Sequence, residues 1–147
     1  MATRYREETF PVPANRLWQT LVDWGGIADW FPEGYIESLD LVGAGDGAVR
    51  IITAPTGQRL GERLDGADHE HFIIQLSITD PMPEGLVYYR ATGRIFPLDA
   101  ASCRLTWASA FKAVDPATEQ QFNEWFGMAV KDMFVGLRDR FSSPHQG

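Results

Sequence analysis

The feature that most constrains this chain is one long amphipathic segment near its C-terminal end. Apolar side chains recur three and four residues apart between Pro116 and Phe141, and Asp115 precedes Pro116 as a helix cap followed by a first-turn proline. A helix over 116–141 would be about 39 Å long at 1.5 Å per residue, which is comparable to a ten-residue strand. One such helix can lie across a whole sheet, so we expect the rest of the chain to supply that sheet.

The preceding segments have the pattern of strands. Three runs alternate apolar and polar residues with a period of two, which is typical of antiparallel strands with one covered face; they cover 70–79, 86–96 and 102–111. Shorter strands are expected over 3–10, 36–42, 48–53 and 58–65, with turns rich in Gly and Pro between most of them. In 86–96 the alternation places Val87, Tyr89 and Ala91 on the covered face.

Two short helical segments are expected between the first two strands. Pro13 suits the first position of a helix over Ala14–Val22, Gly25 and Gly26 would end that helix, and a further turn over Ile27–Phe31 would close at Pro32. The order of one strand, short helices, many strands and a long helix predicts an α+β fold. A length of 147 residues fits one domain.

Charge and cysteine content exclude several classes of function. Twenty acidic and thirteen basic residues give a net charge of −7, which argues against a nucleic-acid partner because such binding needs clustered Lys and Arg. No uncharged stretch approaches the roughly 18–20 apolar residues that span a bilayer, and residues 1–8 lack the apolar run of a signal peptide. The lone Cys103 excludes an internal disulfide and is expected to be a small buried apolar residue. We expect a cytoplasmic protein without a membrane span, as a monomer or a homodimer.

One cluster carries the residue types of a metal site. Residues 68–71 read Asp-His-Glu-His, and His69 and His71 would share one face of the expected strand. Zinc needs three or four ligands, and neither another histidine nor a pair of thiolates is nearby in the sequence. His145 lies in the tail Ser142–Gly147, which we expect to fray. We therefore predict no metal site and no cofactor.

Glu62 and Tyr89 are the candidate functional residues. Leu60, Glu62 and Leu64 share one face of their strand, and an unpaired carboxylate buried there would cost several kcal/mol or shift its pKa upward. Glu62 is then either a polar anchor or proton acceptor for a bound molecule, or the partner of an arginine on the core side, or an exposed strand residue. The Tyr89 hydroxyl needs a partner when buried, which is either a ligand carbonyl or the backbone or water.

Several residues, taken in order, resemble the helix-grip superfamily of Bet v 1-like and START-related proteins, including its bacterial polyketide cyclase/dehydrase-like members. They are Val12-Pro13-Ala14 with Trp18, Trp30-Phe31-Pro32, the segments 45–50 and 61–65, and Trp107. The resemblance covers about residues 3–140. It implies one domain over 1–147, with a curved seven-stranded antiparallel sheet around the C-terminal helix and two short helices after the first strand. It also implies a cavity for a hydrophobic ligand between sheet and helix.

The resemblance further implies which side chains point into that cavity. The implied ligand-binding positions are Glu62, Leu76, Ile78, Tyr89, Ala91, Ser109, Phe126, Val130 and Met133, with Phe134 as an alternative to Met133. The loops 53–57 and 80–85 would flank its mouth. Hormone receptors of the superfamily place a lysine near residues 31–36, where this chain has Glu33 and no lysine. We therefore expect neither a hormone-receptor role nor an anionic ligand.

Three functions stay open as alternatives. The first is binding of a small hydrophobic ligand, such as a lipid, a polyketide or an aromatic metabolite. The second is a polyketide cyclase or dehydratase, in which Glu62 acts as acid or base and Tyr89 supports an enolate oxygen. The third is an interaction module similar to Hsp90 activators, which the Trp30-Phe31-Pro32 segment suggests. Ligand binding is favoured over catalysis, because the inward positions offer only one carboxylate and one phenol, with no histidine, lysine or second acid beside them.

Overall fold

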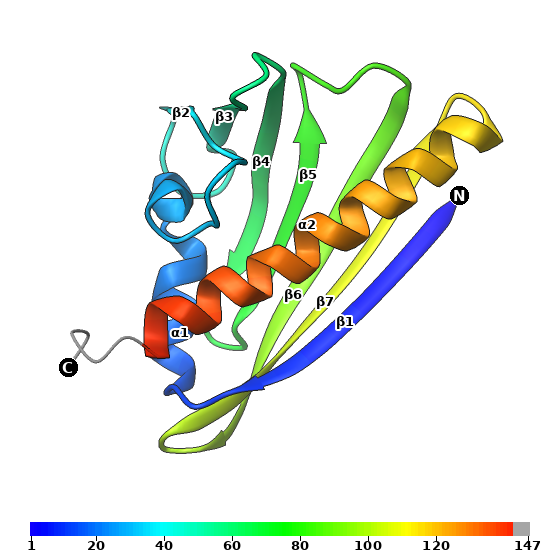
Figure 1. Cartoon of the computed structure of the whole chain (residues 1–147). Coiled ribbons are helices and arrows are strands. Elements are labelled where there is room, and N and C mark those ends of the chain that lie inside the picture. The colour runs from blue at the N-terminus through cyan, green and yellow to red at the C-terminus, as the bar shows by residue number, and fades with distance from the viewer. Residues whose placement is uncertain (143–147) are drawn as a thin grey trace.

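The computed structural model describes residues 1–142 and has the α+β helix-grip architecture (Figure 1). Seven strands form one antiparallel sheet in the order β1-β7-β6-β5-β4-β3-β2. The strands are β1 (Ala2–Phe10), β2 (Ser38–Val42), β3 (Val49–Thr53), β4 (Arg59–Asp68), β5 (Ile73–Thr79), β6 (Leu86–Asp99) and β7 (Ser102–Ala113). The helices are α1 (Ala14–Val22), the 3₁₀ helix η1 (Trp24–Asp29) and α2 (Pro116–Ser142).

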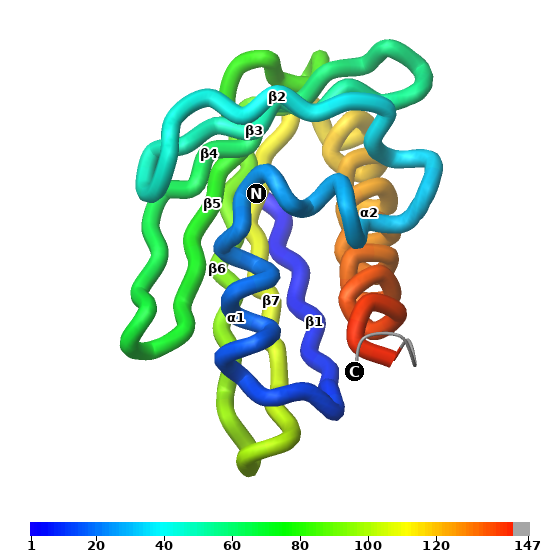
Figure 2. Tube along the Cα trace, turned by 90° about the vertical axis from the view of Figure 1, so that its left-hand side faces the viewer, coloured from blue at the N-terminus to red at the C-terminus, as the bar shows by residue number. Residues whose placement is uncertain are grey.

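Helix α2 crosses the concave face of the curved sheet, and the two views agree on this placement (Figures 1 and 2). The Asp115 carboxylate accepts a hydrogen bond from the Thr118 N–H at 2.7 Å and caps the helix start. The helix was expected over 116–141, and it ends at Ser142. The tail expected to fray was Ser142–Gly147; Ser142 instead belongs to the helix, and residues 143–147, with His145, lie outside the described residues.

Gly136 lets α2 approach the segment that follows η1. A Cβ atom at this position would lie 2.5 Å from the Trp30 carbonyl oxygen and 2.9 Å from Pro32 Cδ. Only a residue without a side chain fits at that distance. The core beneath the helix is dense, since Phe10, Phe111 and Phe134 are fully buried.

A bulge in β6 corrects one predicted face. The register of β6 against β7 shifts between Leu86 and Tyr88. Leu86 is therefore buried and Val87 is 49% exposed, so the prediction for Val87 was wrong. Tyr89 and Ala91 lie beyond the bulge and are buried as predicted.

The histidine cluster also lies elsewhere than predicted, because β4 continues through a bulge to Asp68 and residues 69–72 form a turn. His69 and His71 therefore do not share a strand face. The Trp18 Nε1–H donates to His69 Nδ1 at 3.0 Å, and His71 Nδ1 lies 2.8 Å from an Asp68 carboxylate oxygen. Both histidines thus have structural partners in this turn.

The short elements differ from the predicted ones at their ends. The helix α1 has the predicted bounds, but Gly25 and Gly26 lie inside η1 instead of separating two helices. Strand β2 begins at Ser38, two residues later than expected. No helix within residues 1–142 is both long and apolar enough to cross a membrane.

Candidate functional site

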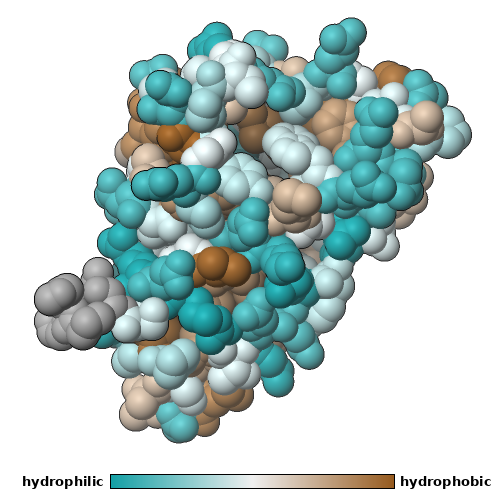
Figure 3. All heavy atoms as spheres, viewed as in Figure 1, coloured by the Kyte–Doolittle hydropathy of each residue, from teal (hydrophilic) through white to brown (hydrophobic). Residues whose placement is uncertain are grey.

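A cavity of about 130 Å³ lies between the concave face of the sheet and α2. Figure 3 shows this face of the molecule, where apolar residues lie at the bottom of a hollow with more hydrophilic residues around it. The apolar lining residues are Ile27, Phe31, Ile36, Ile52, Ala54, Leu60, Leu76, Ile78, Pro83, Phe126, Ala129, Val130 and Met133. The lining residues with polar side-chain atoms are Tyr35, Arg50, Gln58, Glu62, Tyr89, Trp107 and Trp125.

Seven of the nine predicted ligand-binding positions line this cavity, and the loops 53–57 and 80–85 contribute Ala54 and Pro83. Ala91 and Ser109 do not line it. They are buried cross-strand partners on β6 and β7, and the larger Trp107 side chain lines the cavity from β7 instead. Phe134 is fully buried in the core and does not line the cavity.

The polar centre of the cavity wall is an ion pair between neighbouring strands. Arg50 of β3 and Glu62 of β4 are directly opposite in register, and Arg50 Nε donates to Glu62 Oε1 at 2.9 Å. Their side chains are only 7% and 16% exposed. Burial lowers the pKa of the Arg50 guanidinium, whereas the Glu62 carboxylate opposes this shift. The alternative in which Glu62 pairs with a core-side arginine is confirmed, and the same carboxylate also lines the cavity.

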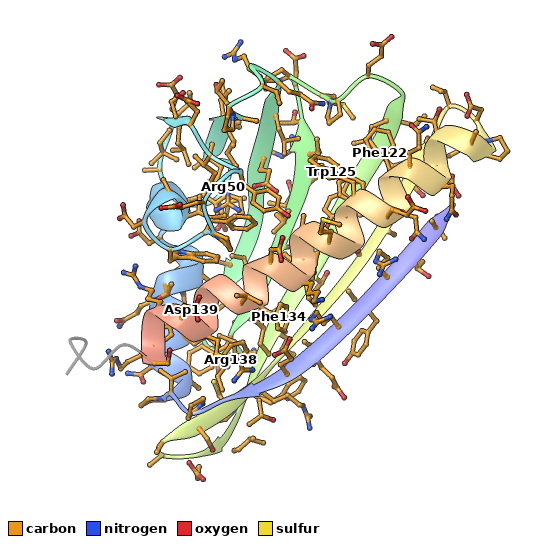
Figure 4. The ribbon with its side chains drawn as sticks, viewed as in Figure 1. Arg50, Phe122, Trp125, Phe134, Arg138 and Asp139 are labelled. Atoms are coloured by element: carbon orange, nitrogen blue, oxygen red, sulfur yellow. The ribbon has the colours of Figure 1, made fainter. Side chains whose placement is uncertain are left out.

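Trp24 of η1 contacts both residues of this ion pair. The Arg50 guanidinium carbon lies 3.5 Å from the centroid of the Trp24 ring, and Arg50 Nη1 donates to the Trp24 carbonyl at 3.2 Å. The Trp24 indole N–H donates in turn to the Glu62 carbonyl at 3.1 Å. A guanidinium stacked on an aromatic face and bonded at its edge has little freedom to turn. The geometry therefore fixes Arg50 toward Glu62 in the cavity wall. Figure 4 labels Arg50 on the β3 side of the molecule and Trp125 on α2.

A second polar group lies on the wall that β6 and β7 provide. Burial raises the pKa of Tyr89 to about 12, the Glu62 charge adds to this shift, and Trp107 and Ser109 beside the hydroxyl oppose it. Trp107 Nε1 is buried and has no hydrogen-bond partner within residues 1–142. The Tyr89 ring packs on Phe126 of α2 with centroids 4.4 Å apart. This wall thus places the Tyr89 phenol within an aromatic cluster, with the Trp107 indole buried beside it.

The segment after η1 closes the cavity on a third side. The Tyr35 hydroxyl donates to the Asp132 carboxylate of α2 at 2.5 Å, and the Phe31 and Tyr35 rings meet edge-on at 4.9 Å. Burial raises the pKa of Tyr35 to about 12, and the bond to Asp132 adds to the shift. Figure 2 shows this cyan segment reaching from the sheet to α2.

Sequence reasoning missed Arg50 as a site residue, although the signal was present. Ala48, Arg50 and Ile52 alternate onto one face, and Ala48 and Arg50 are 3% and 6% exposed. The same parity argument that placed Glu62 inward would have placed Arg50 inward. Pairing them needs the register of β3 on β4, which the sequence alone does not give. Nothing in the sequence indicated that Trp24 would stack on Arg50.

Comparisons with known proteins agree with this fold. Residues 1–142 match the family model described as "Polyketide cyclase / dehydrase and lipid transport". No curated protein matches the sequence.

Among solved structures, a protein from Thermobifida fusca is 28% identical, with a TM-score of 0.80 over 96% of this chain and 93% of that chain. Norcoclaurine synthase from Thalictrum flavum, solved with dopamine and hydroxybenzaldehyde, is 20% identical, with a TM-score of 0.74 over 94% of this chain and 84% of that chain. The di-domain ARO/CYC protein BexL of the BE-7585A biosynthetic pathway is 16% identical, with a TM-score of 0.80 over 95% of this chain and 46% of that chain. The last two likenesses show the shared fold alone.

Proposed function

Because the chain belongs to the polyketide cyclase/dehydrase and lipid transport family, we propose that it binds a small, largely apolar molecule between the sheet and α2. The observation that carries this proposal is the cavity itself, which α2 leaves open against the sheet and which apolar side chains line around one ion pair. Ligand sites typically combine apolar walls with a few placed polar groups. Burying about 200 Å² of apolar ligand surface at about 25 cal/mol per Å² would gain about 5 kcal/mol before the costs of association.

The test is a binding panel against a cavity-filling variant. Thermal-shift and calorimetric titrations would use apolar molecules of graded size, from single-ring aromatics through flavonoids and fatty acids to sterols. Ala129→Leu adds bulk to a lining position of α2, so it should abolish binding while the protein stays folded. Met128→Leu changes a neighbouring side chain that is 61% exposed, and it should bind like the wild type. Absence of binding across the panel, or equal binding by Ala129→Leu, would exclude the cavity as the site.

A second candidate is an enzyme that moves a proton on the bound molecule. Glu62 Oε2 makes no hydrogen bond within residues 1–142, while Oε1 is held by Arg50 and the Tyr89 hydroxyl lies in the same cavity. In that reaction Glu62 removes a proton from the carbon next to a carbonyl and returns it, and Tyr89 donates a hydrogen bond to the enolate oxygen. Deuterium exchange into a bound ketone in D₂O, followed by NMR, measures this step. Exchange that is lost in Glu62→Gln while binding persists supports an enzyme, and no exchange with any bound ketone leaves binding alone.

A further inference from the structure

The convex face of the sheet, on the side away from α2 (Figures 1 and 2), carries a stripe of positive charge. Strand β6 alternates, so that Ala91 is buried on the inner face whereas Arg90 and Arg94 are exposed on the outer face. Arg104 and Lys112 lie on the same outer face of β7, because buried residues alternate with them along that strand. We call these four residues the basic stripe.

The basic stripe is long and narrow. In the register of β6 on β7, Lys112 is opposite Tyr88 at one end and Arg104 is opposite Phe96 at the other end. The two ends are eight residues of β6 apart, which is about 27 Å at about 3.4 Å per residue. The four cations therefore follow two neighbouring strands instead of forming a compact cluster.

Few carboxylates neutralise the basic stripe. Strands β5 and β7 and residues 86–98 of β6 contain no Asp or Glu. Arg104 Nε lies 4.0 Å from a Glu7 carboxylate oxygen, whereas the other three cations form no ion pair within residues 1–142. Because the whole chain has a net charge of −7, this positive face differs in sign from the protein as a whole and is suited to an acidic partner.

A hollow lies in the middle of the basic stripe. One row of residues that are neighbours in register across four strands lines it, namely Tyr5, Ala108, Thr92 and Gln75. The two central side chains of this row are small and the two outer ones are large, so the row is recessed at its centre. Arg90 and Arg94 flank Thr92 along β6. A recess of this kind can receive one large apolar side chain, as the anchor residues of protein interfaces do.

The aromatic rings within the stripe are covered by its own cations. The Arg90 guanidinium carbon lies 5.3 Å from the Tyr88 ring centroid, and those of Arg94 and Arg104 lie 4.6 and 5.0 Å from the Phe96 centroid. Single-stranded nucleic acids need uncovered rings on which bases stack. The net charge of −7 also opposes any larger polyanion, such as a nucleic acid or an anionic bilayer, whereas a short acidic segment contacts the stripe alone.

The backbone of this face favours a helical partner over an extended one. Strands β6 and β7 have a neighbouring strand on both sides, so their backbone groups are already paired within the sheet. A segment that docks on the face must then satisfy its own backbone groups, as a helix does. A helix of about 18 residues matches the length of the stripe. Guanidinium groups suit its carboxylates, because they bind a carboxylate through two parallel hydrogen bonds.

We propose that the basic stripe docks an acidic helix of a partner protein, which places one large apolar side chain in the hollow. The cavity between the sheet and α2 lies on the opposite face of the same sheet. This proposal is therefore independent of the ligand-binding function, and a protein that fails to bind apolar molecules can still bind the acidic helix.

The probes are blocked, fluorescently labelled, Ala-rich peptides of about 18 residues, a length at which such sequences form helix. The first carries Glu along one face and a central Leu, the second has Ala in place of that Leu, and the third has Gln in place of every Glu. In anisotropy titrations at about 0.05 M NaCl, we expect the first to bind at least threefold more tightly than the second and at least tenfold more tightly than the third. Its affinity should fall at least fivefold in about 0.3 M NaCl, because salt screens exposed charges.

The variants locate the surface. Arg90→Glu/Arg94→Glu should weaken binding of the acidic Leu peptide at least tenfold. Arg16→Glu/Lys131→Glu makes the same change in net charge at exposed positions of α1 and α2, and it should weaken binding less than threefold. Ala108→Leu fills the hollow, so the peptides with and without Leu should then bind within about twofold of each other.

Mapping on the wild-type protein needs no variant to fold. In ¹H–¹⁵N spectra, the acidic Leu peptide should shift the amides of β6 and β7 more than those of α2. No binding of this peptide, equal binding of the Gln peptide, or shifts confined to α2 would overturn the proposal.

Other occupants give different results, and each of them overturns the assignment to a partner helix. Tighter binding of an oligothymidylate, or of phosphatidylcholine vesicles with a quarter of phosphatidylglycerol, that is lost in Arg90→Glu/Arg94→Glu identifies a nucleic acid or a bilayer instead. A dimer in sedimentation equilibrium that dissociates in the same variant identifies a second copy of this chain.

Discussion

Replacing Glu62 with leucine while Arg50 stays in place measures how far the fold depends on the buried ion pair. Among residues 1–142, Arg50 would keep one acceptor, the Trp24 carbonyl at 3.2 Å, and would lose its counter-charge. Removing one partner of a buried ion pair costs about 3–5 kcal/mol, because the remaining charge is left without compensation. We expect Glu62→Leu to lower the free energy of unfolding by that amount.

Two further variants test the cause. Arg50→Met leaves the Glu62 carboxylate, which is 16% exposed and faces the cavity, so water can reach it and the loss should be smaller, about 2–3 kcal/mol. The double variant Arg50→Met/Glu62→Leu removes both charges and fills the site with apolar atoms. It should be at least about 2 kcal/mol more stable than Glu62→Leu alone.

Urea unfolding followed by circular dichroism at pH 7 measures these differences, and each kcal/mol should move Tm by about 2–4 °C. A surface pair on the same strand is the control. Arg63 Nε and Asp65 lie 2.7 Å apart but are 49% and 30% exposed, so Arg63→Met should cost less than about 1 kcal/mol. A loss below about 1 kcal/mol for Glu62→Leu, or a double variant as unstable as the sum of the two single variants, would refute the reasoning.

Three other predictions follow from single features of the structure. Gly136→Ala should lower the free energy of unfolding by about 1–3 kcal/mol, because its Cβ would meet the Trp30 carbonyl. Gly127→Ala on the same helix is the control and should be neutral or stabilising, because its Cβ would meet the movable side chain of Arg4. Urea titrations of both variants measure the difference. The pKa values of Tyr35 and Tyr89 are raised from 10.0 to about 12, so the folded state favours both neutral phenols. Their contribution to stability is complete below pH 10 and is lost between pH 10 and 12. In urea titrations, a Tyr35→Phe/Tyr89→Phe variant should therefore lose less unfolding free energy than the wild type between pH 9 and pH 11. Cys103 is fully buried, and burial raises its pKa to about 11. Ellman's reagent should therefore not react with the folded protein at pH 8, and it should detect one thiol per chain in 6 M urea. Rapid reaction without urea would contradict the packing around Cys103.

The fold was predictable because its signals are periodic. The alternation in β5, β6 and β7 and the spacing of apolar residues in α2 identify which faces are covered, and those faces can only cover one another. The errors occur where the period breaks. The bulge near Leu86 moves Val87 to the surface, and the turn at residues 69–72 removes His69 and His71 from a strand face. A bulge adds a residue without a distinctive composition, so alternation alone does not locate it.

The site was predictable in its position and less so in its chemistry. Parity placed Glu62 and Tyr89 inward, and both line the cavity. The partner of Glu62 depends on the register of β3 against β4, and Trp24 reaches the ion pair from a 3₁₀ helix that has no periodic pattern. Contacts of this kind join residues that are distant in sequence, so they follow from the assembled sheet and not from any one segment.

The contacts of Trp24 with Arg50 and Glu62 connect the cavity wall to the 3₁₀ helix η1. A ligand that attracts the Arg50 guanidinium also acts on the Trp24 carbonyl and ring, because Arg50 contacts both. Trp24 is the first residue of η1, so the effect reaches the start of that helix. Backbone amides of residues 24–29 should therefore exchange with deuterium more slowly when the chamber is occupied, although of these residues only Ile27 borders it. Binding in the cavity would therefore be detectable as slower amide exchange in η1.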